Sequence, residues 1–402
     1  MRKKPMVVAG VMSGTSADGI NVALVKFDGS RNLFSASETP AGARPRHALS
    51  LVGQAEYAYP PKVRNAVLSA MNASRASVAD LSRLNFLLGE LYAEAVLETQ
   101  RKFRTEVNLV GCHGQTLYHQ GDAKVFLGRK VSTTWQTGEG SIIAARLGAP
   151  VISDFRPADM AAGGKGAPLV PFLDYLWFRD HHIGRIVQNI GGIANLTAIP
   201  AGARAERVFA FDTGPGNMVI DAVMQKRFGK AFDSDGKQAA SGTPNEPILQ
   251  RLLSRQFFRA KPPKTAGREE FGREFVAQFL QLCGRARKHD VVATATALTA
   301  RSITDAVQRY VIPAARRRNS FRELVISGGG ARNATLVAML AEQLAPLGIV
   351  VRFSDEFGLP SEAKEAVAFA VLAYETWNRR PSNVPSATGA ARPAVLGKIS
   401  YA

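Results

Sequence analysis

The chain has 402 residues, of which 46% are hydrophobic, so it has enough material for two packed domains or one large duplicated architecture. Its longest apolar stretches are far too short to span a bilayer, and the apolar run 6–9 is too short for a signal peptide. The two distant cysteines, Cys112 and Cys283, form no CxxC motif, which excludes a disulfide framework and fits a reducing cytoplasm.

The net charge of +18 is compatible with binding of nucleic acid or of acidic small molecules. The basic residues are mostly dispersed, and the densest cluster, Arg316-Arg317-Arg318 with Arg322, has few aromatic neighbours. A solvated loop explains this cluster better than a nucleic-acid patch does. We therefore expect no nucleic-acid or membrane partner, while the positive charge would help to recruit a phosphate-bearing substrate.

The first half of the chain predicts strands followed by alternating helices and strands. Three strands are expected over 6–13, over 20–27 and near 32–38. Apolar residues at helical spacing predict a long amphipathic helix over 78–103. The next elements are a strand, a helix and a strand, over 107–111, 139–147 and 150–153.

The second half begins with segment 154–168, which is rich in glycine and charge and has no periodicity, so we expect a functional loop. Strands are expected over 185–190, 193–199, 208–211, 323–327 and 349–353. Helices are expected over 216–227, 271–284, 291–314, 332–345 and 361–378, with a second glycine- and charge-rich loop over 262–269. Because strand pairs with glycine turns open both halves, this order predicts a duplicated α/β unit.

Asp212 stands at the tip of one expected strand, directly before the break Gly214-Pro215-Gly216 and a helix. A carboxylate in this place suits chemistry, because glycine backbone lets a ligand approach closely and the N–H groups of a helix start attract anions. An Asp that only forms the turn or caps the helix explains this segment equally well.

Three strand-ending glycine loops could offer backbone N–H groups to phosphate oxygens: Gly14 to Gly19, Gly191-Gly192 and Gly328 to Gly330. None matches the Walker A pattern or a GxGxxG fingerprint with a downstream acid, so a dinucleotide fold is disfavoured. Three such loops in different parts of one chain are better explained by one nucleotide cleft between two halves.

The sequence resembles the anhydro-N-acetylmuramic acid kinase family in six motifs, which occur in the family's order and extend nearly from end to end. These motifs are Gly10 to Gly19, His113 to Thr116, Asp154 to Arg156 through Gly166 to Leu169, Asn189 to Gly192, Phe211 to Asn217, and Gly328 to Asn333. The resemblance implies an α/β fold of two actin-like ATPase (ribonuclease H-like) domains with a central nucleotide cleft. We expect the first domain over 1–153 plus 383–402 and the second over 154–382.

The family resemblance also implies an activity. ATP would phosphorylate O6 of 1,6-anhydro-N-acetylmuramic acid while water opens the anhydro bridge, giving N-acetylmuramic acid 6-phosphate and ADP in cell-wall (peptidoglycan) recycling. The implied protein is a cytoplasmic homodimer that uses Mg²⁺. Two other readings stay open: a levoglucosan-type anhydro-sugar kinase, and a non-catalytic nucleotide-gated binder like actins and chaperones.

By this resemblance, ATP would be bound by three groups of residues. The phosphate hairpin is Gly14, Thr15, Ser16, Ala17, Asp18, Gly19, Ile20 and Asn21; the second phosphate loop is Gly191 and Gly192; the adenosine site is Gly328, Gly329, Gly330 and Asn333. Backbone amides and the hydroxyls of Ser13, Thr15 and Ser16 can donate to phosphate oxygens, and Asp18 and Glu365 are candidate Mg²⁺ ligands.

Asp212 is the expected general base that takes a proton from the attacking water. The expected sugar-binding residues are His113, Arg156, Asp159, Gly214 and Glu365. Arg156 suits a carboxylate because its guanidinium can donate two parallel hydrogen bonds. Simpler roles remain open for four of them.

These simpler roles are structural. Arg156 and Asp159 could form an ion pair within their loop, His113 could only tie its loop, and Glu365 could be a solvated helical acid. Two residues also depart from the family pattern, because Asn21 stands where the family usually has Asp and Lys165 replaces the usual Gln. These departures keep the levoglucosan alternative open.

Overall fold

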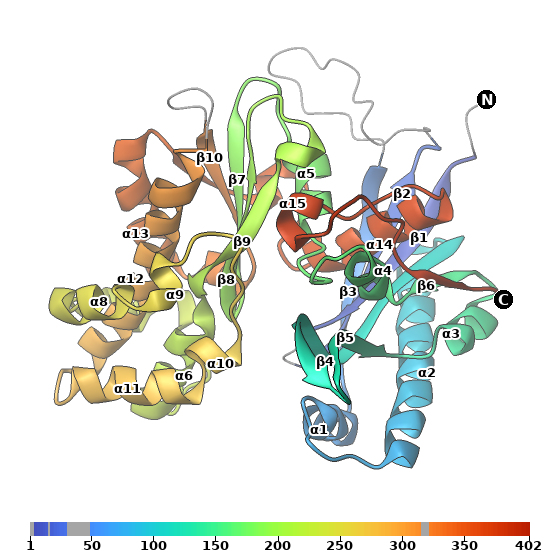
Figure 1. Cartoon of the computed structure of the whole chain (residues 1–402), viewed down its shortest axis with the longest axis horizontal. Coiled ribbons are helices and arrows are strands. Elements are labelled where there is room, and N and C mark those ends of the chain that lie inside the picture. Colours follow the sequence, from blue (N-terminus) through green and yellow to red (C-terminus); the bar gives the residue numbers. More distant parts are fainter. Residues whose placement is uncertain (1–3, 15–16, 30–48, 315–320) are drawn as a thin grey trace. The chain divides into compact units, whose positions relative to one another are not determined.

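The computed structural model describes residues 4–14, 17–29, 49–314 and 321–402. Packing divides the chain into two α/β units (Figure 1). Unit 1 is Met1–Trp177 with Ala363–Ala402, and unit 2 is Phe178–Glu362. These limits differ from the expected ones, because 154–177 and the long helix α14 (Lys364–Trp377) pack with the first sheet.

The described strands of unit 1 form one sheet in the order β12-β6-β4-β1-β2-β3, with β5 paired to β4. Their bounds are β1 Met6–Ser13, β2 Gly19–Phe27, β3 Leu49–Ala58, β4 Leu109–Phe126, β5 Arg129–Thr137, β6 Val151–Ser153 and β12 Lys398–Ser400. Strands β1, β2 and β3 are antiparallel neighbours, whereas β4 runs parallel to β1 and β6 runs parallel to β4.

The helices of unit 1 are α1 Pro61–Ala70, α2 Val78–Phe103, α3 Gly140–Leu147, α4 Phe155–Ala161, α5 Pro171–Phe178, α14 and α15 Pro385–Thr388. Most of them pack against strands of this sheet. Helix α14 lies against β1 and β4 at two glycines: a Cβ at Gly10 would collide with the carbonyl of Ala366, and one at Gly111 with that of Phe369. Glycine therefore allows the close approach that fixes the start of α14.

The described strands of unit 2 form a sheet in the order β11-β10-β7-β8-β9. Their bounds are β7 Gly184–Ile190, β8 Ile193–Ile199, β9 Phe209–Pro215, β10 Phe321–Ser327 and β11 Val350–Phe353. The first three strands are antiparallel, and β10 runs parallel to β7 and to β11. This is the topology of β6-β4-β1-β2-β3, so the predicted duplication of an α/β unit is confirmed.

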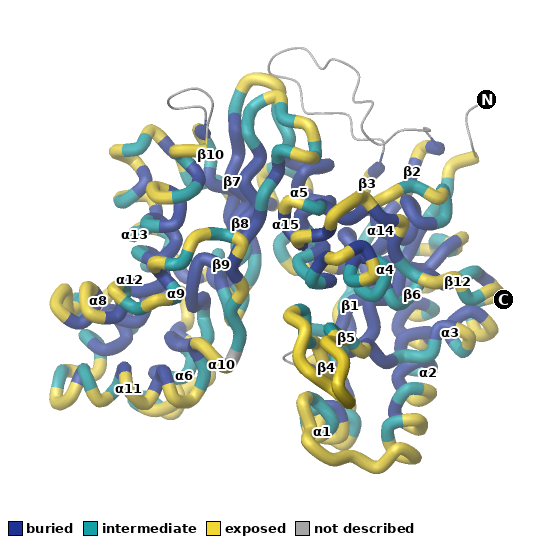
Figure 2. Tube along the Cα trace, viewed as in Figure 1, coloured by how far each residue is buried: buried dark blue, intermediate teal, exposed yellow. Residues whose placement is uncertain are grey.

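The long helix α12 (Lys288–Ala306) of unit 2 is mostly buried, packs against α6, α7, α8 and α13, and continues into one π-helical turn, Val307–Val311 (Figure 2). The others are α6 Asn217–Phe228, α7 Lys237–Ala240, α8 Glu246–Leu253, α9 Gln256–Arg259, α10 Arg268–Phe271, α11 Arg273–Cys283 and α13 Ala334–Leu344. No helix in the described ranges is both long and apolar enough to cross a membrane.

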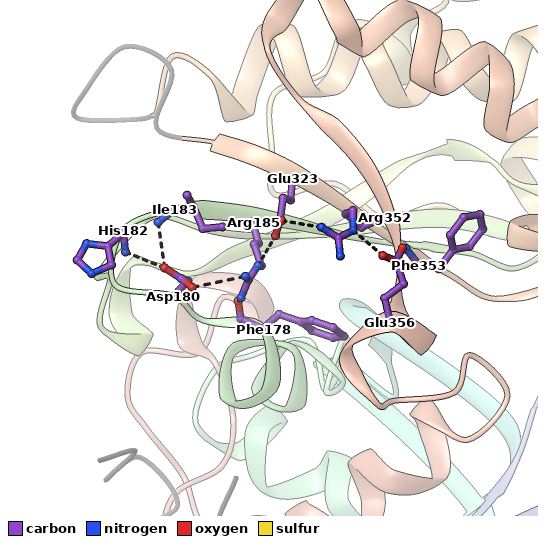
Figure 3. Close-up of polar contacts among 9 residues, drawn as sticks. All are labelled: Phe178, Asp180, His182, Ile183, Arg185, Glu323, Arg352, Phe353 and Glu356. Carbon is purple, nitrogen blue, oxygen red and sulfur yellow. Dashed lines mark hydrogen bonds and ion pairs between the residues drawn. The ribbon is translucent and has the colours of Figure 1, made fainter. Parts of the chain in front are cut away.

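A network of ion pairs joins three parallel strands of unit 2 (Figure 3). Arg185 on β7 donates to Glu323 on β10 at 2.6 Å and to the carbonyl of Phe178 at 3.0 Å. Arg352 on β11 reaches the other oxygen of Glu323 at 3.4 Å and Glu356 at 2.7 Å. The side chain of Arg185 is only 9% exposed, so this network ties the first residue of unit 2 to the middle of its sheet.

Several expected elements need correction. Segment 154–168 is not wholly a loop, because Phe155–Ala161 forms α4; this helix is too short to show periodicity, and it tolerates Pro157 in its first turn. Strand 107–111 extends to Phe126 and forms an exposed hairpin with β5 (Figure 2). The strand expected near 32–38 lies outside the described residues.

Candidate active site

Buried polar side chains form hydrogen bonds that support the loop between β1 and β2. Ser13 Oγ lies 2.7 Å from Gln115 Oε1 and 3.0 Å from the carbonyl oxygen of Gly19, while Gln115 Nε2 donates to the carbonyl of Gly14 at 3.1 Å. Ser13 and Gln115 are both buried. The Ser13 hydroxyl therefore joins the two ends of the expected phosphate hairpin, a structural role that the sequence did not indicate.

This buried chain continues through two tyrosines. Tyr59 donates to Ser13 Oγ at 2.9 Å, and its hydroxyl lies 3.0 Å from that of Tyr92. Burial raises the pKa of Tyr59 to about 12 and that of Tyr92 well above its usual value, so both tyrosines stay neutral at physiological pH. Gln115 belongs to a motif that the sequence singled out, whereas nothing in the sequence marked the two tyrosines.

The hairpin residues themselves lie in different environments. Thr15 and Ser16 are outside the described residues. Ala17 has a left-handed φ of 51° and donates to the carbonyl of Gly14 at 3.1 Å, which closes the turn. Asp18 is exposed, Gly19 and Ile20 are buried, and Asn21 is half-buried in β2 opposite Met12. Asp18 therefore presents the accessible carboxylate of this loop.

His113 on β4 and Arg156 on α4 form the second cluster of unit 1. Arg156 Nη2 lies 2.8 Å from His113 Nε2, and His113 Nδ1 lies 2.7 Å from the carbonyl of Gly114. Because a guanidinium only donates, Nε2 must accept, and the ring proton is on Nδ1. Burial and the charge of Arg156 hold the pKa of His113 well below its usual value. His113 is thus a neutral support for Arg156.

The Arg156 guanidinium also donates to the carbonyl of Gly166 at 2.7 Å, while its buried Nε has no hydrogen-bond partner in the described part of the chain. Burial lowers the pKa of Arg156 to about 10, and the negative charges of Glu365 and Asp159 act in the opposite direction. The group therefore remains a cation at neutral pH.

Asp159 is fully buried and saturated with donors. Its carboxylate accepts from Gly166 N at 2.8 Å, Asn383 Nδ2 at 2.7 Å and Thr388 Oγ1 at 2.8 Å. Asp159 thus ties the glycine loop to the C-terminal segment. This geometry differs from the expected sugar contact and from the alternative ion pair with Arg156, because the carboxylate is occupied by other donors.

Glu365 lies in the first turn of α14, where burial raises the pKa of its carboxyl, against the positive charges of Lys364 and Arg156. One turn later on the same helix, the ring of Phe369 lies 4.6 Å from the ring of His113. Strand β4 and helices α4 and α14 therefore bring three of the predicted sugar-binding residues together: His113, Arg156 and Glu365.

In unit 2, Asp212 lies within β9 rather than at its tip, because Gly214 and Pro215 still pair with β8 at Ala194 and Ile193. Its Oδ2 accepts from the Ala266 amide at 2.7 Å, and its own amide donates to the carbonyl of Lys264 at 3.0 Å. Among the described residues, no hydrogen bond is made to Oδ1.

Burial raises the pKa of Asp212 to about 6, against the Ala266 hydrogen bond and the charge of Lys264, which lower it. A carboxylate with this pKa is ionised at neutral pH and still basic enough to accept a proton in a reaction. The second glycine- and charge-rich loop, 262–269, thus meets Asp212, a contact that the sequence did not predict.

Two of the predicted glycine loops meet around the end of β7. Gly216 packs so closely that a Cβ would collide with the carbonyl of Gly191, to which Asn217 N donates at 2.7 Å. Gly328, with φ of 83°, and Gly330 pack against Ile190. Gly192 and Gly329 are exposed, so unit 2 brings accessible backbone from both loops near one strand end.

Two further predicted residues have structural contacts. Asn333 is buried and caps α13 by accepting from Leu336 N at 3.0 Å. Gly214 is buried, and a Cβ there would collide with Ser302 and Phe258. Among the described residues, no group of three or more His, Cys, Asp or Glu could hold a metal ion. A site with one or two carboxylates remains compatible with Mg²⁺, which keeps water and phosphate oxygens as its other ligands.

Unit 2 repeats the sheet topology of unit 1, and it combines exposed glycine backbone after two strands with a carboxylate of raised pKa, features that fit a phosphotransfer enzyme. The chain belongs to the anhydro-N-acetylmuramic acid kinase family, whose model matches residues 6–402.

Curated relatives carry this family name. One from Caldanaerobacter subterraneus subsp. tengcongensis is 43% identical over 99% of this chain and 98% of its own length. One from Bacillus cereus (strain ZK / E33L) is 40% identical over 98% of this chain and 99% of its own.

Solved structures with distant similarity include two that hold ADPNP or AMPPNP. The activator of 2-hydroxyisocaproyl-CoA dehydratase from Clostridium difficile, with ADPNP, is 15% identical with a TM-score of 0.40, covering 92% of this chain and 95% of its own. A ROK family glucokinase from Streptomyces griseus, with glucose and AMPPNP, is 11% identical with a TM-score of 0.39, covering 92% and 99%.

Proposed function

We infer that this chain is an ATP-dependent kinase that opens 1,6-anhydro-N-acetylmuramic acid with water and phosphorylates its O6. The products are N-acetylmuramic acid 6-phosphate and ADP, and the reaction belongs to peptidoglycan recycling. Membership of the family over nearly the whole chain supports the overall reaction. The observation that carries the mechanism is the carboxylate of Asp212, whose pKa is raised to about 6 and of which one oxygen is held by Ala266.

Asp212 is the general base in this proposal. Its Oδ1 accepts a proton from water as the water oxygen bonds to the anomeric carbon and the bond from that carbon to O6 breaks. The released O6 then attacks the γ-phosphate of ATP, and ADP leaves. Because the Ala266 amide holds Oδ2, the carboxylate cannot rotate freely, so Oδ1 keeps one direction towards the water.

Arg156 is the proposed receptor for the lactyl carboxylate of the sugar. Its charge is retained at neutral pH, and neutral His113 fixes the guanidinium from one side. Glu365 is close enough to Arg156 for their charges to interact, and we propose that it accepts hydrogen bonds from sugar hydroxyls. This role is an alternative to a contact with Mg²⁺.

The exposed backbone at Gly192 and Gly329 is the proposed nucleotide-binding surface of unit 2, and the Gly14–Asn21 hairpin is that of unit 1. Mg²⁺ bound with ATP would neutralise the charge that develops on the transferring phosphoryl group. Asp18 offers an exposed carboxylate for this ion. A homodimer and a cytoplasmic location stay predictions from the family.

The departure at Lys165 gives little support to a levoglucosan-type kinase. Its ammonium pairs with Asp122 on β4 at 2.9 Å, so the added charge has a partner within unit 1. A cationic Arg156 instead favours a sugar that carries a carboxylate.

ADP release, measured with and without sugar, tests this proposal. We expect turnover that requires 1,6-anhydro-N-acetylmuramic acid and is much weaker with levoglucosan. ATP hydrolysis that is independent of any sugar would instead support a nucleotide-gated binding protein. Preference for levoglucosan would overturn the proposed role of Arg156.

A further inference from the structure

Lys264 is a buried lysine in the loop between α9 and α10, and only 8% of the residue is exposed. Its ammonium donates to the carbonyl of Phe257 at 3.0 Å and lies 4.6 Å from the centroid of the Phe257 ring. The ammonium also lies 5.4 Å from the centroid of the Tyr310 ring, and the Tyr310 hydroxyl donates to the carbonyl of Arg259 at 3.1 Å. The charged end of this buried side chain therefore lies over two aromatic rings, an arrangement that stabilises a cation.

The backbone beside this enclosed side chain holds Asp212 at two points. The carbonyl of Lys264 accepts from the Asp212 amide at 3.0 Å, and the Ala266 amide donates to Asp212 Oδ2 at 2.7 Å. The three-residue segment 264–266 thus contacts both the main chain and the carboxylate of Asp212. Segment 264–266 lies in an irregular loop. The Lys264 side chain connects this segment to α9 through Phe257 and to the turn after α12 through Tyr310.

Charged groups from three elements act on this pair. Lys264 stabilises the ionised form of Asp212, whereas Glu269 on α10 opposes it. Arg309, which follows α12 and pairs with Asp305 at 3.6 Å, repels the ammonium of Lys264. Burial lowers the pKa of Lys264 to about 8, so most of the ammonium remains charged at neutral pH.

We propose that Lys264 is a positioning residue for the reaction: its enclosed ammonium anchors segment 264–266, so that the Ala266 amide fixes one oxygen of Asp212 and leaves the other to accept the proton. The proposal rests on the role of Asp212 as the general base. It assigns the loop 262–269, which the sequence marked only by its glycines and charges, to the support of that base.

The test compares the dependence of kcat on pH in Lys264→Met and in the wild type. Loss of a nearby positive charge raises the pKa of a carboxylate, so the acid limb should move upward from about pH 6 by about 1 unit. We also expect kcat at neutral pH to fall at least about tenfold, with little change in the KM for ATP. Lys264→Arg keeps the charge and should keep the acid limb of the wild type.

Exposed Lys261 is the matched control, and Lys261→Met should behave as the wild type. If Lys264→Met does not fold, Lys264→Gln provides the same comparison. An acid limb that coincides with that of the wild type, with activity lost only in proportion to folded protein, would overturn the positioning role. Asp212→Asn separates the two proposals. If Asp212→Asn is inactive while the acid limb of kcat in Lys264→Met stays at the wild-type pH, only the positioning role of Lys264 is wrong. If Asp212→Asn retains full turnover, the proposed general base itself is wrong.

Discussion

Replacement of Asp212 by Asn should make the protein more stable and far less active. Burial raises the pKa of Asp212 from 3.8 to about 6, so ionisation at neutral pH costs the folded state free energy. A shift of about two pKa units corresponds to at most about 3 kcal/mol. Asn has no charge to bury, and its side-chain oxygen can still accept from the Ala266 amide.

The pH dependence gives the sign of this effect. The unfolded carboxyl loses its proton near pH 4, whereas the folded one keeps it until about pH 6. The wild type therefore loses stability as pH rises through this window, and Asp212→Asn does not. Urea unfolding at pH 5 and pH 8 should show a larger stabilisation of the variant at pH 8, together with a loss of about 10²–10⁴-fold in kcat.

Asp221 on α6 is a matched control, because burial alone raises its pKa to about 6. Asp221→Asn should gain stability in the same direction and retain turnover. If the gain in unfolding free energy of Asp212→Asn over the wild type is no larger at pH 8 than at pH 5, burial does not raise the pKa of Asp212 as described. One that retains turnover would refute the role as base.

Three further experiments test the sugar contact, the hairpin support and the ion-pair network. Arg156→Met should lower kcat/KM for the carboxylate-bearing sugar by about 10–100-fold without changing the KM for ATP, because charge-assisted hydrogen bonds contribute about 1.5–3 kcal/mol; an equal loss with levoglucosan would contradict a carboxylate contact. Gln115→Leu removes the contacts to Ser13 and Gly14 and should raise the KM for ATP more than the KM for the sugar, as measured by initial rates. An unchanged KM for ATP would show that these contacts do not support ATP binding by the hairpin. Arg185→Met removes the buried donor of Glu323 and of the Phe178 carbonyl, and it should lower the free energy of unfolding by about 3–5 kcal/mol. Arg352→Met changes a side chain that is 39% exposed and should lower that free energy by only about 0–1 kcal/mol. Equal losses in the two variants would show that burial does not set the strength of this network.

The sequence predicts those parts of the fold that depend on local pattern. The helix 78–103 is confirmed at both ends, where Ser77 caps its first turn and Arg104 adopts a left-handed conformation. The duplicated order of strands is also confirmed, because strand pairs with glycine turns and the alternation of helices and strands are visible in local sequence patterns. Helix α4 and the extended β4 are missed, since the first is a single short segment and the second is a solvated hairpin.

The candidate site shows the same limit. Motifs identify His113 and Arg156, but their hydrogen bond joins residues 43 positions apart, and only the packing of β4 against α4 reveals it. Asp159 accepts from Thr388, which is 229 residues away, so its structural role has no local signal. Lys264 likewise stands in an irregular loop, where no periodicity points to a buried side chain.

The coupled ring opening is tested most directly by mass spectrometry of the products formed from ATP, Mg²⁺ and 1,6-anhydro-N-acetylmuramic acid in H₂¹⁸O. We predict one ¹⁸O atom at C1 and an unlabelled phosphate on O6, with equal amounts of ADP and phosphorylated sugar. A phosphorylated sugar with its anhydro bridge intact, or label in the phosphate rather than at C1, would contradict it.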